Sequence, residues 1–155
     1  MPSFKTERRV AHSADEMFAL VADVEQYPKF VPLCERLIVR GRQQDAAREV
    51  LVADMTVAYK IVRETFTTKV VLDRLGSTIR ADYLDGPFKH LENIWSFAAI
   101  DAEHSVIRFS IDYEFRSRTL STLMGAVFDK AFRKFADAFE KRADEIYGKA
   151  ALPSA

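Results

Sequence analysis

Residues 13–34, SADEMFALVADVEQYPKFVPLC, join a capped helix to a segment rich in aromatic residues and proline. Ser13 and Glu16 form an S-x-x-E capping box, in which both side chains satisfy free backbone N–H groups at a helix start. Apolar residues then recur at helical spacing. Pro28 and Pro32 end regular helix, because proline fixes φ and lacks an N–H donor. We predict an amphipathic helix followed by a compact aromatic platform.

The composition of the chain indicates one soluble domain. Its 155 residues, 48% of them hydrophobic, suffice for a single core. The 23 basic and 23 acidic residues give a formal net charge of +0, so no global field attracts DNA or an anionic membrane, and only local charged patches are left open. A lone cysteine and the lack of a signal-type apolar segment favour a cytoplasmic protein. We predict one domain over residues 1–149 and a disordered tail over residues 150–155.

Alternating apolar and polar residues follow the first helices. In residues 107–115, for example, apolar Ile107 and Phe109 alternate with polar Arg108 and Ser110, as in a strand with one buried face. The other predicted strands are residues 37–42, 49–58, 78–83 and 88–100, with residues 59–72 as one strand or a bent pair.

The last predicted element is a helix of about seven turns over residues 119–147. Phe128, Phe132, Phe135 and Phe139 fall within an arc of about 60° on its surface, and charged residues take the opposite side. This stripe is either ordinary core or the wall of a cavity. The element order predicts an α+β helix-grip fold, in which a curled antiparallel sheet surrounds a long C-terminal helix and two short helices follow the first strand.

Two segments carry a family resemblance: DVEQYPKFVPLC at residues 23–34 and GPFKHLENIWSF at residues 86–97. Together with the phenylalanine-rich helix, they resemble the coenzyme Q-binding START-domain family of the polyketide-cyclase-like superfamily. Bacterial members of this family are also called ribosome-association toxins. Leu33 departs from the family pattern, which often has an aromatic residue before the cysteine, so a stacking contact there is not carried over.

The resemblance implies a carrier of ubiquinone, or of a similar prenylated lipid, that supports respiratory electron transport without chemistry or cofactor of its own. Such a site needs apolar walls and a few hydrogen-bond donors, which Tyr27, His90, Asn93 or the Trp95 Nε1–H could supply. A domain with a radius of gyration of about 15 Å cannot enclose a long polyprenyl tail, which would protrude toward a partner or a peripherally contacted membrane. The candidate ligand-binding residues are Phe18, Val21, Tyr27, Phe30, Val31, Phe88, His90, Leu91, Trp95, Phe109, Phe128, Phe132 and Phe135.

The sequence also suggests where a ligand enters the cavity. Residues 27–32 and the turn at residues 86–88 both combine proline or glycine with aromatic residues. We expect the two segments to lie at one end of the domain and to form the cavity mouth with partly exposed rings.

The family's second name implies an alternative function, contact with the ribosome that blocks the joining of its subunits. RNA binding needs clustered basic residues. Arg116 and Arg118 lie close in sequence, and Arg40, Arg42 and Arg48 flank one turn, but the sequence leaves their convergence open.

A polyketide-cyclase-like enzyme is the third alternative. His90 could form an acid/base pair with Glu92 or Asp85. The sequence has no metal-binding motif, nucleophile elbow or phosphate loop, so we expect neither a metal nor catalysis. Cys34 has no histidine near it in sequence and is expected to be a buried apolar side chain.

Overall fold

The chain alternates between helical and extended segments in the predicted order. The computed structural model describes residues 3–45 and 48–148, so the tail predicted at residues 150–155 lies outside the described residues. The elements are β1 (Ser3–Val10), α1 (Ala14–Ala22), the 3-10 helix η1 (Val24–Lys29), β2 (Cys34–Asp45), β3 (Arg48–Tyr59), β4 (Val62–Asp73), β5 (Thr78–Asp85), β6 (Phe88–Ala99), β7 (Ser105–Phe115), α2 (Arg118–Arg133) and α3 (Phe135–Tyr147).

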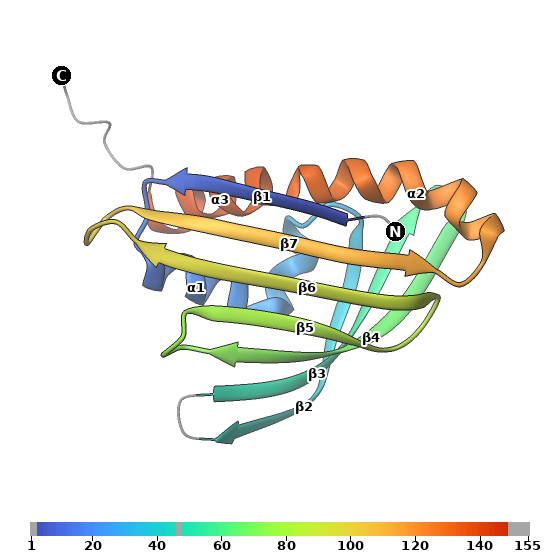
Figure 1. The fold of residues 1–155 in the computed structure, drawn as a ribbon, viewed down its shortest axis with the longest axis horizontal. Helices are drawn as coiled ribbons and strands as arrows, with labels where there is room; N and C mark the ends of the chain where they lie inside the picture. The colour runs from blue at the N-terminus through green and yellow to red at the C-terminus, as the bar shows by residue number, and fades with distance from the viewer. Residues whose placement is uncertain (1–2, 46–47, 149–155) are drawn as a thin grey trace.

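The strands form one antiparallel seven-stranded sheet in the order β1-β7-β6-β5-β4-β3-β2. Strands β2 to β7 pair with their neighbours in sequence, whereas β1 pairs with β7, with Phe4 opposite Ile111. Register shifts interrupt three ladders, including one between Phe88 and His90 in β6. Such bulges increase the local twist of a strand. The sheet curls around α2 and α3 (Figure 1), which confirms the helix-grip prediction.

The capping box of α1 forms as predicted. The Ser13 hydroxyl accepts a hydrogen bond from the Glu16 amide at 3.0 Å, and the Glu16 carboxylate accepts one from the Ser13 amide at 3.1 Å. The apolar face of the helix, which includes Met17 and Leu20, is buried. The helix is therefore fixed at its start by local hydrogen bonds and along its length by burial.

The predicted single C-terminal helix is wrong in one respect, because it is broken into α2 and α3 at Lys134. The Lys134 amide donates to the Ala131 carbonyl at 3.0 Å, the tighter i→i−3 bond of a 3-10 turn. Phe132 and Phe135 flank the break, and their rings reach Tyr113 at 5.2 Å and Phe109 at 5.8 Å. Packing of both rings against β7 thus accompanies the tightened turn.

Residues 59–72, predicted as one strand or a bent pair, contain the tip of a hairpin. Tyr59 ends β3 and pairs with Val62, the first residue of β4. Lys60 takes a φ of 55° in the turn between them. Positive φ in such a turn usually selects glycine or asparagine, so this turn has no clear signal in the sequence.

Candidate ligand-binding cavity

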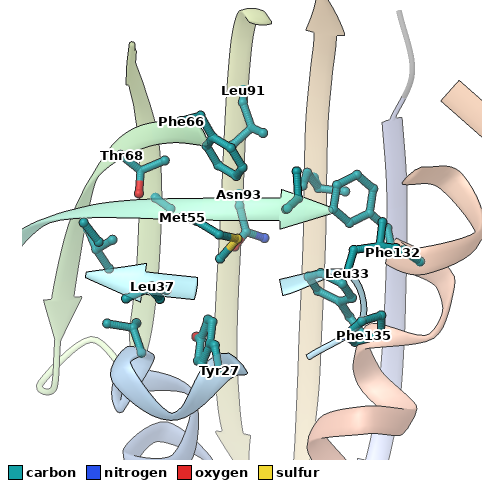
Figure 2. A pocket seen from close by; sticks show the side chains of 18 of the residues that line it. Tyr27, Leu33, Leu37, Met55, Phe66, Thr68, Leu91, Asn93, Phe132 and Phe135 are labelled. Atoms are coloured by element: carbon teal, nitrogen blue, oxygen red, sulfur yellow. The ribbon is translucent and has the colours of Figure 1, made fainter. Parts of the chain in front are cut away.

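An apolar cavity lies between the concave face of the sheet and the helices η1, α2 and α3 (Figure 2). The cavity volume, counted as the positions that the centre of a water molecule can take, is about 90 Å³. At about 10–15 Å³ for each water in this measure, the cavity has room for roughly six to nine waters. An apolar cavity between two layers is the usual place for a small-molecule site, and this one is smaller than the roughly 300–1,000 Å³ of pockets that enclose a drug-sized ligand.

Six of the predicted ligand-binding residues line this cavity. They are Tyr27, Leu91, Trp95, Phe128, Phe132 and Phe135. Trp95 is only 3% exposed, and its ring lies 4.8 Å from that of Phe139, which also lines the cavity. The structure thus brings together rings from η1, β6, α2 and α3.

The other seven predicted residues lie outside the lining: Phe18, Val21, Phe30, Val31, Phe88, His90 and Phe109. Phe18 packs on Phe97 at the α1 side of the sheet, with ring centroids 5.7 Å apart. Phe109 is covered by Trp95, whose ring lies 4.7 Å away. His90 faces the outer side of the sheet, where its Nε2 lies 3.8 Å from a carboxylate oxygen of Asp112.

Much of the lining comes from inward-facing strand residues that were not among the predicted site residues. Alternate positions of the strands contribute Ala53, Met55 and Val57, then Phe66, Thr68 and Val70, and then Ile79 and Ala81. Asn93 of β6, which was predicted as a possible hydrogen-bond donor, also lines the cavity. The signal that could have identified them is the period-2 alternation, which puts all these side chains on the concave face.

Tyr27 contributes its ring to the cavity and keeps its hydroxyl bonded within the protein. The hydroxyl donates to the Val21 carbonyl at 2.5 Å, and the ring meets Phe139 edge-on at 5.3 Å. Burial is the main reason why the pKa of Tyr27 is raised well above its ordinary range, and the nearby Cys34 and Asp23 raise it further. The expectation that Tyr27 donates to a ligand is therefore replaced by a structural role for its hydroxyl.

Two polar side chains, Thr68 and Asn93, point into this apolar space from β4 and β6 (Figure 2). The Asn93 amide nitrogen donates to the Ser110 carbonyl at 2.9 Å. A carboxamide carries two N–H donors and a carbonyl acceptor. One donor and the acceptor of Asn93, together with the Thr68 hydroxyl, therefore remain to meet polar atoms of a ligand.

Charged side chains and histidines are absent from the described lining residues. The three histidines lie elsewhere: His12 Nε2 lies 2.7 Å from Asp144 and His104 Nδ1 lies 2.8 Å from Asp101, whereas His90 Nε2 is 3.8 Å from Asp112, beyond hydrogen-bond distance. In residues 3–45 and 48–148, no group of histidine, cysteine or carboxylate side chains is arranged to hold a metal ion. The cavity thus offers apolar contact and neutral hydrogen bonds.

The expected mouth at residues 86–88 is wrong, because this turn is packed shut. Phe88 is 0% exposed. Gly86 has a φ of 140°, and a Cβ there would lie 2.6 Å from the Cβ of Phe66. Only glycine tolerates so close an approach in this conformation.

The side of the cavity next to Leu33 is less covered than the turn at residues 86–88. Leu33 and Phe135 both line the cavity and are only half-buried, and Figure 2 draws Leu33 beside Phe132 and Phe135. Leu33 has a φ of 68°, an unusual conformation for a leucine. We place the mouth between Leu33 and the α2–α3 break.

Cys34 is buried beside this mouth, and its thiol provides a pH-dependent prediction. Burial raises the pKa of Cys34 from 9.0 to about 11. The unfolded chain therefore loses this proton first as the pH rises, so stability present below pH 9 is lost between about pH 9 and pH 11. A fully shielded thiol with this pKa would lose about 2–3 kcal/mol of unfolding free energy, and solvent screening reduces the expected loss to about 1–2 kcal/mol.

Urea denaturation from pH 8 to pH 11 measures this loss, with Cys34→Ala as the comparison. We expect the unfolding free energy of the variant to fall less steeply with pH than that of the wild type. Parallel pH profiles would show that the thiol contributes nothing to the alkaline loss.

Three comparisons place the chain among known proteins. The family model described as "Polyketide cyclase / dehydrase and lipid transport" matches residues 10–140. A protein from Vibrio cholerae named ribosome association toxin RatA is 34% identical over 90% of this chain and 94% of its own. Coenzyme Q-binding protein COQ10 homolog B from Xenopus laevis is 30% identical over 98% of this chain and 62% of its own.

A solved structure agrees with the fold. The Zhui aromatase/cyclase from Streptomyces sp. R1128 superposes with a TM-score of 0.79, covering 96% of this chain and 99% of its own at 18% identity. At this identity the similarity concerns the fold alone. The curled sheet, the cavity and the family match over residues 10–140 agree, and the chain belongs to the polyketide cyclase / dehydrase and lipid transport family.

Proposed function

We propose that the protein binds ubiquinone or a similar prenylated quinone and carries it without chemical change, in support of respiratory electron transport. The observation that carries this proposal is the uncharged apolar cavity with two polar side chains, Thr68 and Asn93, in its wall. A quinone ring has two carbonyl acceptors on an otherwise apolar ring. The remaining Asn93 donor and the Thr68 hydroxyl match those acceptors, and the aromatic wall matches the ring.

The size of the cavity limits how much of the lipid it encloses. Room for roughly six to nine waters accommodates a substituted ring and a short piece of tail, but not a long polyprenyl chain. The remaining tail would leave past Leu33 and Phe135, where the lining is only half-buried. The protein would thus carry the lipid with its ring enclosed in the cavity and its tail protruding.

The lining also favours binding over turnover. Acid/base catalysis needs a titratable group within reach of the bound molecule. The one ionisable side chain in the described lining is Tyr27, whose hydroxyl donates to the Val21 carbonyl and whose pKa is raised by burial. Quinone incubated with the purified protein should therefore be recovered unchanged.

The proposal is tested by extracting protein purified from its own host with organic solvent and measuring quinone by mass spectrometry. We expect quinone in the wild-type extract. Thr68→Val should bind it about 2- to 10-fold more weakly, the equivalent of one hydrogen bond. Thr67→Val is the matched control, because Thr67 lies on the outer face and donates to Asp54.

Two outcomes would count against the carrier role. Wild-type extracts without any prenylated lipid would remove its basis. A new product formed from added quinone would make the protein an enzyme, whichever residue forms it.

Contact with the ribosome is the second candidate function, and it rests on the relative named ribosome association toxin RatA. The basic side chains that flank the β2–β3 turn do not form a free cluster, because Arg40, Arg42 and Arg48 are each paired with a carboxylate. Arg42 lies 2.5 Å from Glu25, and Arg48 lies 3.7 Å from Asp73. Because paired cations are less available to RNA phosphates, the surface around the β2–β3 turn gives this candidate little support.

Sedimentation of ribosomes in a sucrose gradient distinguishes the two candidates. The carrier proposal expects an unchanged ratio of subunits to joined ribosomes when the purified protein is added. A concentration-dependent loss of joined ribosomes would favour the second candidate, and the same experiment with Thr68→Val would show whether the cavity takes part.

A further inference from the structure

The tip of the β3–β4 hairpin exposes two apolar side chains to solvent. Ile61 is 99% exposed and Tyr59 is 37% exposed. Between them, the Lys60 ammonium lies 5.4 Å from the centroid of the Tyr59 ring. An isoleucine that lies almost entirely in water lacks the burial that makes such residues favourable in folded proteins.

This hairpin tip is joined to the mouth of the cavity by the backbone. The Ala58 amide donates to the Leu33 carbonyl at 3.0 Å, and Cys34 pairs with Val57 in the sheet. Val57 and Leu33 both line the cavity. The tip therefore projects from the strand that flanks the mouth, two residues beyond a cavity-lining side chain.

The first turns of α2 supply a second exposed apolar side chain at the same end of the molecule (Figure 1). Leu123 is 59% exposed there. Residues 118–128 contain no acidic side chain. Arg118 is the first residue of the helix, and Arg116 lies two residues before it. Two elements that are distant in sequence thus present exposed apolar and basic side chains at one end of the molecule.

The basic residues of this surface differ in pairing from those on the sheet. Arg42, Arg63 and Arg80 on the sheet each form ion pairs with carboxylates. Within the part of the chain that the structure describes, Lys60, Arg116 and Arg118 are in none of the ion pairs. The Arg116 guanidinium donates one hydrogen bond to the Phe88 carbonyl at 2.9 Å, and no carboxylate of the described residues neutralises the three positive charges.

We propose that the hairpin tip and the first turns of α2 dock on the surface of a bilayer that contains anionic lipid. Protruding aliphatic and aromatic side chains enter the boundary between headgroups and acyl chains, while lysine and arginine meet the lipid phosphates. A bilayer fits better than a folded protein, because the apolar side chains are separate projections, with Lys60 next to Tyr59 and Ile61 and with Arg118 at the start of α2. The role of this docking rests on the proposed carrier function, since it brings the mouth to the source of the lipid.

No helix in the described chain combines the length and apolar character needed to cross a bilayer. Docking would therefore be peripheral, and its strength would depend on a few side chains. Each cation near an anionic surface strengthens binding about 5-fold, and this part weakens with added salt. Insertion of one isoleucine side chain contributes about 10-fold or more.

The test is cosedimentation of the full chain with vesicles that contain no quinone. Vesicles of phosphatidylcholine are compared with vesicles of equal parts phosphatidylcholine and phosphatidylglycerol. We expect binding to the anionic vesicles, about 10-fold weaker binding for Ile61→Asp, and about 5-fold or more weaker binding for Lys60→Glu.

Two matched variants serve as controls, one for replacing an exposed apolar side chain by aspartate and one for reversing a positive charge. Leu75→Asp removes a side chain that is 86% exposed in the β4–β5 turn, at the opposite end of β4. Lys141→Glu reverses an exposed charge on α3. Both should bind within about 2-fold of the wild type, because neither lies in the proposed docking surface.

The proposal is overturned if the wild type binds neither vesicle, or if Ile61→Asp and Leu75→Asp weaken binding equally. It is also overturned if Ile61→Asp leaves vesicle binding unchanged but converts a dimer to a monomer in analytical ultracentrifugation. Because the vesicles hold no quinone, these results are independent of quinone retention. Quinone retention with failed docking would therefore reject the docking surface alone.

Discussion

Replacing Phe88 with alanine is expected to lower the free energy of unfolding by about 3–5 kcal/mol, the range for deleting a fully buried phenylalanine ring. Phe88 is 0% exposed, and its ring centroid lies 4.8 Å from that of Phe115 and 5.3 Å from that of Phe66. It also packs 6.1 Å from Phe128 of α2. Loss of this ring removes contacts that join β4, β6, β7 and α2.

Urea denaturation at neutral pH measures the effect, with two variants as controls. Phe88→Leu keeps most of the apolar volume and should cost roughly 1–2 kcal/mol. Phe30→Ala removes a half-buried ring and should cost less than Phe88→Ala. A loss below about 1 kcal/mol for Phe88→Ala would mean that the site collapses around the missing ring.

Filling the cavity should abolish most of its ligand retention. Ala131 lies on α2, is 7% exposed and lines the cavity, so Ala131→Phe puts a ring into the free space. We expect retained quinone to fall more than about 10-fold, because the bound ring and the new side chain would occupy the same volume. The extraction and mass spectrometry described above measure it.

The control for this experiment is Ala126→Phe, which places the same ring on an exposed position of α2. Thermal unfolding of both variants shows whether each keeps the fold. A folded Ala131→Phe protein that retains as much quinone as the wild type would move the ligand site away from this cavity.

Local signals account for the parts of the fold that the sequence predicted. The hydroxyl of Ser13 and the carboxylate of Glu16 act on amides three residues away, so the helix start is determined within one turn. Apolar and polar residues alternate in residues 107–115 because every second side chain of this strand faces the core. Neither signal depends on distant residues.

The break at Lys134 and the turn at Lys60 could not be predicted in the same way. Neither position carries the glycine or proline that usually ends an element. At Lys134, the tightened turn accompanies the packing of Phe132 and Phe135 on β7, a contact between distant segments. Tertiary contacts therefore decide what local propensity leaves open.

The candidate site was predictable to the extent that aromatic residues on inward faces were identified. Trp95 and Phe128 reach the cavity, but Phe88 does not, because the β-bulge at residues 88–90 and the surrounding rings hold it in the solid core. Phe109 of β7 likewise does not reach the cavity, because the Trp95 ring covers it. Which ring lines a space and which fills it depends on how the layers stack.

The pairing of β1 with β7 has a consequence for how the chain folds. β1 is synthesised first among the described strands, but its partner ends at Phe115, so about a hundred residues must be made before the ladder closes. Contacts of such long separation in sequence slow folding, since the intervening chain must be ordered first. In the interval, the amides and carbonyls of β1 that later face β7 are bonded to water. The N-terminal strand is therefore expected to be among the last segments to gain protection from hydrogen exchange during folding.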